Sequence, residues 1–228
     1  MKRSEINRYI DWAVSVCEKL HIALPSFAFW TPEEWKRRGT TVSHMLAVKQ
    51  GWDVTDYNSG NFDAVGAVLF TLRNGNIYDK EEGTPYCEKV IIMKEGQKLP
   101  LHFHYSKTED IINRGGGVLC VRVYNSTSKQ DGFQLDHKSK VYLRLDGIPV
   151  SLPAGGVVEV ANGNSITLTP YIYHEFWAKE GEGDLVIGEV SSINDDTRDN
   201  HFIGDINLPK IEEDEPVRYP LCNGYVQK

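Results

Sequence analysis

Two histidines and a glutamate stand close together in "HFHYSKTE", with His102 and His104 two residues apart and Glu109 five residues further on. Successive side chains of an extended strand point to opposite faces, so His102 and His104 face the same way. A turn through "YSKT" can bring the Glu109 carboxylate back to the same point. Two neutral imidazoles and one carboxylate suit a borderline divalent cation such as Mn, Fe, Co, Ni or Zn. His174, in the later run "TPYIYHEFW", is the natural candidate for a fourth ligand.

A pair of histidines two residues apart is a weak signal by itself, because such a pair on an ordinary strand is more often structural. The other four histidines lack similar company and are expected at the surface or in the core. They are His21, His44, His137 and His201.

Short strands are the elements that would position these residues. From about residue 64, β-branched runs alternate with Gly, Asn, Asp and Pro, and no helical pattern lies between them. This order predicts an antiparallel sandwich or barrel rather than a parallel sheet. The runs are "AVGAVLFTL", "EKVIIMK", "GGVLCVRVYN", "KVYLRLDG", "VVEVANGNSITLTP" and "GDLVIGEVSS".

Two helices are predicted before the strands. Apolar residues recur at three- and four-residue spacing over residues 4–21, with Ser4 as the expected N-cap. In "TPEEWKRRG", Thr31 can cap a second helix, Glu34 completes a capping box, and Gly39 can end the helix.

The 228 residues, 40% of them hydrophobic, are enough for one domain with a substantial core. We expect a helical extension over 1–63, a barrel over 64–204 and a wrapping segment over 205–228. The acidic run "IEEDE" in that last segment is most simply a solvated stretch. The four cysteines are scattered without metal or redox spacing, and are expected to be reduced and buried.

The net charge of −7 works against binding to nucleic acid or to anionic lipid, which requires clustered Lys and Arg. No stretch approaches the roughly 20 apolar residues of a membrane span, and the N-terminus has no apolar signal core. A cytoplasmic protein is therefore expected.

The spacing of glycines around the histidines makes the metal site more specific. Five residues follow one another at the intervals of the first cupin motif: Gly96, His102, His104, Glu109 and Gly116. The chain therefore resembles the cupin superfamily, in which such residues bind a metal inside a jelly-roll barrel.

The second cupin motif is matched less closely. Gly163 precedes His174 by the usual spacing, but Pro170 is displaced by one residue and Ile172 stands where the family usually has glycine. The turn before His174 is therefore expected to differ from that of other cupins.

Within this superfamily the chain resembles the D-lyxose ketol-isomerases, through "LPSFAFWTPEEWKRRG", the strands between the motifs and "GEVSSINDDTRDNHF". The resemblance implies a manganese-binding barrel that interconverts D-lyxose with D-xylulose, and D-mannose with D-fructose. It implies a homodimer, and it makes His102, His104, Glu109 and His174 the metal ligands.

An aldose–ketose isomerisation moves a hydrogen between C1 and C2, so a base is needed beside the metal. Glu189 is the first candidate, because it alternates with apolar residues on one strand face and its burial would be costly without a role. Such a setting can raise the pKa of a carboxyl towards neutrality. The alternative is an edge-strand glutamate that faces water. Lys89, Asp196 and Asp205 are the next candidates for the base.

Lys89 shares a strand face with apolar residues and could aim its ammonium into the barrel, towards substrate oxygens. A solvated strand end is the alternative. Asp195, Asp196 and Arg198 belong to "NDDTRDN", which is a turn by composition. Their donors and acceptors would also suit sugar hydroxyl groups at the barrel mouth.

Three other functions tolerate the same metal ligands. They are a cupin-type phosphosugar isomerase, a metal-dependent cupin dioxygenase and a non-catalytic sugar-binding cupin. A neutral sugar is favoured over a sugar phosphate, because the chain has neither a P-loop nor a glycine-rich loop that opens a helix.

Overall fold

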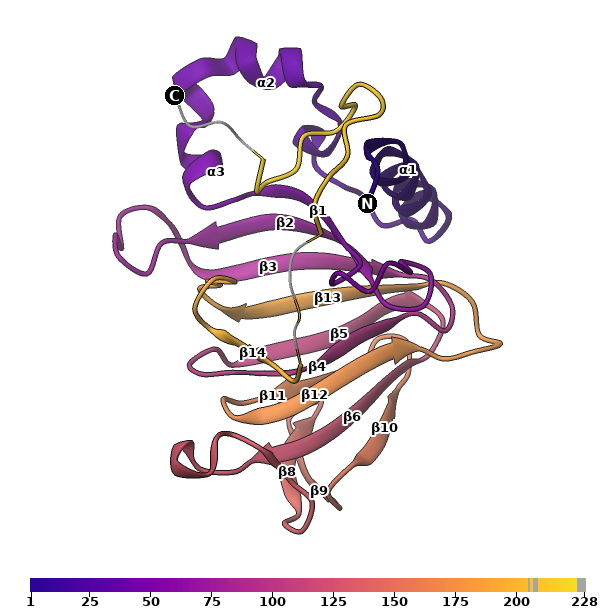
Figure 1. The fold of residues 1–228 in the computed structure, drawn as a ribbon, viewed down its shortest axis with the longest axis vertical. Coiled ribbons are helices and arrows are strands. Elements are labelled where there is room, and N and C mark those ends of the chain that lie inside the picture. The colour runs from indigo at the N-terminus through magenta and orange to yellow at the C-terminus, as the bar shows by residue number, and fades with distance from the viewer. Residues whose placement is uncertain (205, 207–208, 225–228) are drawn as a thin grey trace.

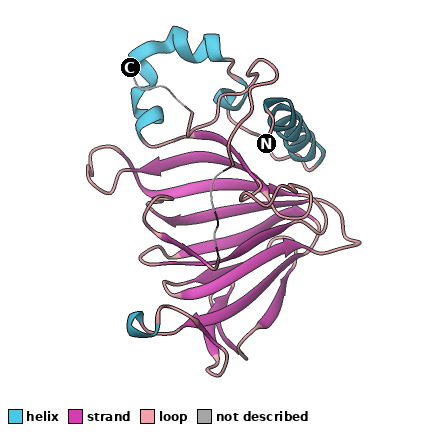
Figure 2. Ribbon diagram, in the orientation of Figure 1, coloured by secondary structure: helices cyan, strands magenta, loops and turns pink. Residues whose placement is uncertain are grey.

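Strands dominate the chain from residue 51 onwards and form two antiparallel sheets, shown in Figures 1 and 2. The computed structural model describes residues 1–204, 206 and 209–224. The larger sheet has the order β1-β2-β3-β13-β5-β11-β8-β9, and the smaller sheet has the order β10-β6-β12-β4-β14, with β7 paired to β6. The mainly β, antiparallel barrel expected from the sequence is confirmed.

The helical elements are α1 (Arg3–Lys19), η1 (Ser26–Phe29), α2 (Pro32–Arg38), η2 (Gly39–Val42), α3 (Ser43–Ala47) and η3 (Lys129–Asp131). The strands are β1 (Gly51–Thr55), β2 (Ala67–Gly75), β3 (Gly83–Met93), β4 (Lys98–His104), β5 (Glu109–Gly116), β6 (Leu119–Ser126), β7 (Leu135–Asp136), β8 (Val141–Leu145), β9 (Ile148–Leu152), β10 (Gly156–Val160), β11 (Ser165–Leu168), β12 (Ile172–Ala178), β13 (Leu185–Ser192) and β14 (Asn200–Phe202).

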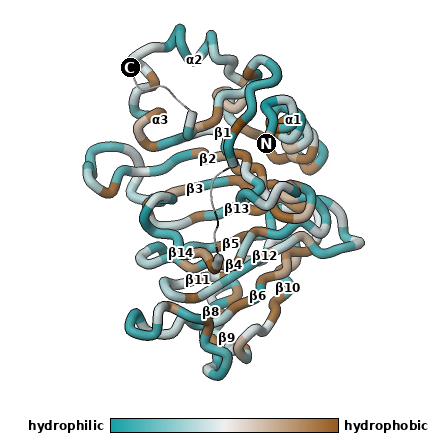
Figure 3. Tube along the Cα trace, in the orientation of Figure 1, coloured by the Kyte–Doolittle hydropathy of each residue, from teal (hydrophilic) through white to brown (hydrophobic). Residues whose placement is uncertain are grey.

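Strand β3 is buried on both faces, which explains its uninterrupted apolar run. Ile91 and Met93 belong to the core between the sheets. Val90 and Ile92 belong to a second core, in which helix α1 covers the outer face of β2, β3 and β13. The hydropathy colours in Figure 3 contrast these strands with helix α2, which is largely hydrophilic. None of the described helices combines the length and apolar character of a membrane crossing.

Helix α2 is capped as its sequence predicts. The Thr31 side chain accepts a hydrogen bond from the Glu34 amide at 3.2 Å, and the Glu34 carboxylate accepts one from the Thr31 amide at 2.8 Å. Gly39 ends the helix. Helix α1, in contrast, begins at Arg3, so the prediction of Ser4 as its N-cap was wrong.

The acidic run near the C-terminus is not simply solvated, because it binds the first turn of α1. Arg3 donates to both carboxylate oxygens of Glu213, at 2.8 and 2.7 Å. The amide and hydroxyl of Ser4 donate to Asp214, at 2.9 and 2.7 Å. Carboxylates suit this end of a helix, where the backbone amides are unpaired and the helix dipole is positive. The sequence-based interpretation was incomplete, since a charge run shows no partner by itself.

The C-terminal segment also reaches strand β1. Figure 1 shows its last described part, in yellow, close to α1 and β1. The Cys222 amide donates to the Trp52 carbonyl at 2.7 Å, and the Asn223 side chain donates to Asp53 at 3.2 Å. The segment therefore links α1 with the edge strand of the larger sheet. Strand β1 itself was not predicted from the sequence.

We predict that Arg3→Met will lower the free energy of unfolding by about 1–2 kcal/mol, because two charge-assisted hydrogen bonds of a buried guanidinium are lost. Urea unfolding measures the change. Arg73→Met is the matched control: Arg73 is 47% exposed and meets Glu88 at 3.2 Å, so its loss should cost ~0.5 kcal/mol or less. Equal effects of the two substitutions would show that the C-terminal contact adds no stability.

Candidate active site

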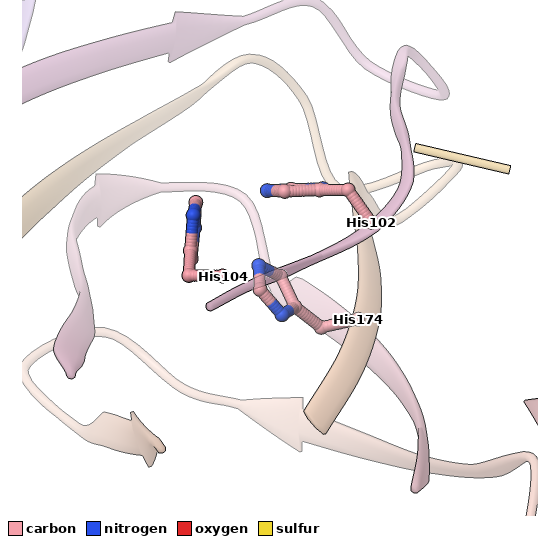
Figure 4. Close-up of side chains that lie close together, drawn as sticks. All are labelled: His102, His104 and His174. Carbon is pink, nitrogen blue, oxygen red and sulfur yellow. The ribbon is translucent and has the colours of Figure 1, made fainter. Parts of the chain in front are cut away.

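The three histidines singled out by the sequence come from two neighbouring strands. His102 of β4 lies directly opposite His174 of β12 in the antiparallel register, and His104 follows two residues along β4. Ligand atoms of the three side chains lie within 4.8 Å of one another, and all three residues are buried. Figure 4 shows their rings directed towards a common space.

Backbone carbonyls determine which ring nitrogen carries a proton in two of these histidines. Nδ1 of His102 lies 2.8 Å from the Pro100 carbonyl, and Nδ1 of His174 lies 3.0 Å from the Ile172 carbonyl. A carbonyl can only accept, so each Nδ1 carries a proton, and in the neutral ring Nε2 keeps its lone pair. This is the usual arrangement of a metal-binding histidine. Burial, followed by the other two histidines, lowers the pKa of His102, which favours its neutral form.

Glu109, the first residue of β5, faces the histidines from the other sheet. One carboxylate oxygen lies 3.0 Å from Nε2 of His174, and the other lies 3.4 Å from Nε2 of His104. Several buried atoms of this cluster have no hydrogen-bond partner within the described residues. They are the close oxygen of Glu109, Nε2 of His174 and both ring nitrogens of His104.

A cation relieves this arrangement. When its ring is neutral, His174 presents the Nε2 lone pair to the Glu109 oxygen at 3.0 Å, and the two atoms repel unless a cation lies between them. Ligand atoms at right angles on a metal, each roughly 2 Å from it, are themselves about 3 Å apart. The buried donors therefore fit a divalent metal ion.

The turn before His174 is built around Tyr171. Tyr171, not the following Ile172, takes the left-handed conformation, with φ of 65°. Its amide donates to the His104 carbonyl at 3.0 Å, and its carbonyl accepts from the Ser126 amide at 2.9 Å. The turn is thus tied to both neighbouring strands, and β12 still places His174 beside β4.

Lys107 was missed by the sequence analysis and lies at the centre of the site. Its ammonium is 2.8 Å from Glu109 and 2.8 Å from Glu189, and it is only 3% exposed. Lys89 continues the series, at 3.7 Å from Glu189 and 3.6 Å from Asp196. A row of alternating charges thus runs along the inner face of the larger sheet. We call the five residues of this series the charge row: Glu109, Lys107, Glu189, Lys89 and Asp196.

Glu189 is buried on the inner face of β13, as its alternation with apolar residues predicts. The expectation that this setting raises its pKa was wrong. Burial alone acts in that direction, but Lys107 and Lys89 outweigh it and lower the pKa of Glu189. The error arose because neither lysine could be placed beside Glu189 from the sequence.

The turn that carries Lys107 is held by Asp199, whose role the sequence did not reveal. The Asp199 carboxylate accepts from the amide and hydroxyl of Ser106, at 2.8 and 2.7 Å, and from the Lys107 amide at 3.1 Å. This side chain fixes the turn through "YSKT" that returns Glu109 to the histidines.

The site opens into a cavity of about 320 Å³. Its wall includes Lys89 and Asp196, as well as His102, His104, Glu109 and Glu189. Asp195 and Arg198 line an adjoining cavity of about 280 Å³, which Lys89 and Asp196 also border. Arg198 contacts the Tyr78 hydroxyl there. Asp205 lies outside the described residues.

Comparison with known proteins identifies the family. A model of the D-lyxose isomerase family matches residues 1–225. The chain belongs to the D-lyxose isomerase family. It is 40% identical to a D-lyxose/D-mannose isomerase of Escherichia coli O157:H7, over all of this chain and 99% of that protein. The corresponding protein of Serratia proteamaculans is 39% identical over the same shares.

Solved structures support the fold. A variant of the L-ribose isomerase of Acinetobacter sp. DL28 in complex with L-ribose superposes with a TM-score of 0.60 and 15% identity, covering 93% of this chain and 98% of that one. The L-ribose isomerase of Geodermatophilus obscurus gives 0.58 and 17% over the same shares. The chain shares the fold of these L-ribose isomerases. Its membership of the D-lyxose isomerase family makes it an enzyme of the aldose–ketose isomerase class.

We predict that His104→Ala will lower metal affinity by at least about 100-fold, because water cannot replace a buried ligand without loss. Purified protein is incubated with Mn²⁺, desalted and analysed for metal per chain. His137→Ala is the control, since His137 is exposed and remote from the cluster. Full metal occupancy in the His104 variant would contradict the assignment.

Proposed function

We propose that this D-lyxose isomerase family member is a metal-dependent ketol-isomerase. It interconverts D-lyxose with D-xylulose, and D-mannose with D-fructose. One observation carries the proposal: two histidines of the cluster, two buried carboxylates and two buried lysines line one cavity, and the third histidine, His174, lies beside them. The names of the two curated relatives support the choice of sugars.

The proposed metal ligands are His102, His104, Glu109 and His174. The first choice of metal is Mn²⁺, and Co²⁺, Fe²⁺, Ni²⁺ or Zn²⁺ are the alternatives. A metal in this position supplies Lewis acidity towards the two substrate oxygens. The Glu109 oxygen that lies close to His174 faces the histidines. The other Glu109 oxygen lies 2.8 Å from the ammonium of Lys107.

Glu189 is proposed as the base. Its low pKa keeps it ionised at neutral pH, so it can accept a proton. In the aldose-to-ketose direction the C2–H bond breaks, the proton passes to Glu189, and the electron pair of that bond gives an enediolate. Glu189, whose proton exchanges with solvent, returns a proton to C1, while the hydroxyl proton of O2 moves to O1. Lys107 fixes the carboxylate at 2.8 Å.

Lys89 and Asp196 are proposed to bind substrate hydroxyl groups in the main cavity. Asp195 and Arg198 would act from the adjoining cavity, where Asp195 also accepts from Thr197. An uncharged sugar is favoured over a sugar phosphate, because Asp196 would repel a phosphate at this end. The homodimer and the cytoplasmic location expected from the sequence stay predictions.

We expect metal-free protein, prepared with EDTA, to be inactive on a panel of aldoses. Adding back Mn²⁺ should restore turnover of D-lyxose and D-mannose, and the other divalent metals should restore it to different extents. A ketose assay measures the rates. Full activity after verified metal removal would refute metal dependence, and oxygen consumption in place of ketose formation would favour a dioxygenase.

We predict that Glu189→Gln will lower kcat by about 10² to 10⁴, the usual contribution of a general base, and leave metal content unchanged. Turnover by the wild type in deuterated water should place deuterium on C1 of the ketose. Glu159→Gln, at an exposed carboxylate of β10, is the control and should be normal.

The remaining outcomes separate the alternatives. Unlabelled product together with a nearly normal Glu189 variant would favour a direct hydride shift between the carbons. Labelled product with a normal variant would move the base to Lys89, Asp196 or Asp205.

A further inference from the structure

Asp53 lies at the end of the cavity that is remote from the histidines. It belongs to β1, which is four places from the Glu109 strand, β5, in the order of the larger sheet. Neighbouring strands are about 4.8 Å apart, so the two residues lie well apart on this sheet. Asp53 nevertheless lines the same cavity as Glu109 and Glu189. Its register partner Leu69 lines the cavity too.

Both carboxylate oxygens of Asp53 keep capacity for a further hydrogen bond. One accepts from the Val54 amide at 2.9 Å, and the other accepts from the Asn223 side chain at 3.2 Å. Each oxygen of an ionised carboxylate can accept two hydrogen bonds, so one position on each remains. Burial, followed by the charge of nearby Asp196, raises the pKa of Asp53 to about 6.

The reaction fixes the direction of the sugar, and this step rests on the proposed function. C1 and C2 must lie between the histidines and Glu189. The remaining carbons must then extend past Lys89, which spans from Glu189 to Asp196, towards β1. A hexose extends one carbon further than a pentose in this direction.

We propose that Asp53 accepts a hydrogen bond from the terminal hydroxyl of a hexose and thereby determines how well the enzyme uses hexoses relative to pentoses. The C-terminal segment holds Asp53 for this role through Asn223. Strand β1 and the C-terminal segment, which lie outside the two histidine motifs, thus supply the chain-length specificity of the barrel.

The test compares kcat/KM for D-mannose and D-lyxose in wild type, Asp53→Ala and Asp53→Asn. Losing a hydrogen bond to a charged group should lower kcat/KM for D-mannose about 10- to 100-fold and that for D-lyxose only a few-fold. Asp53→Asn keeps the size and one acceptor, so it should show a smaller shift in the same direction. It also carries the test if the alanine variant does not fold.

Asp63→Asn is the matched control, because this carboxylate is 64% exposed, contacts Lys94 and does not line the cavity. An unchanged ratio of the two kcat/KM values in both Asp53 variants would overturn this inference but leave the proposed function intact. So would a wild type that isomerises D-lyxose but not D-mannose. A metal-loaded wild type that converts neither sugar would instead refute the proposed function on which the inference rests.

Discussion

The burial of four charged side chains in alternating order, with the half-exposed Asp196 at one end, is the constraint on which the rest of the site depends. Removing an ion from water is expensive, and a buried charge without a partner costs about 3–5 kcal/mol. In the charge row each carboxylate meets an ammonium within 3.7 Å, from Glu109 to Asp196. The signs alternate only while β3, β13 and β5 keep their register, which pairs Glu189 with Lys89 and with Ile111. Strand pairing and site chemistry therefore support each other.

Local signals in the sequence were enough to predict the parts of the site that lie on single strands. The spacing of His102 and His104 implies one face of a strand, and the structure places both rings with His174. Alternation along β13 likewise predicted that Glu189 points inwards. Capping of α2 followed from Thr31 and Glu34 alone. In each case the residues that decide the geometry are neighbours in the chain.

Contacts between distant segments could not be predicted in this way. Lys107 stands in a polar turn, where a lysine normally faces solvent. The Asp199 carboxylate, 92 residues away, holds this turn, and Glu109 and Glu189 bind the ammonium inside the barrel. The pKa of Glu189 was misjudged for the same reason, since its two lysines come from other elements. Asp53 shows no local signal, because β1 becomes part of the cavity wall only after it pairs with β2.

Glu109 connects the two halves of the site. One of its oxygens faces His174 at 3.0 Å, and the other binds Lys107 at 2.8 Å. Lys107 divides its ammonium between Glu109 and Glu189. A positive charge among the histidines partly neutralises the Glu109 carboxylate. Glu109 then attracts Lys107 less, so the ammonium of Lys107 interacts more strongly with Glu189. The position and basicity of the proposed base therefore depend on what the histidines hold, although Glu189 touches none of them. This coupling gives a physical reason for the placement of the lysine: it keeps two like charges in one buried site and connects the histidines to the proposed base.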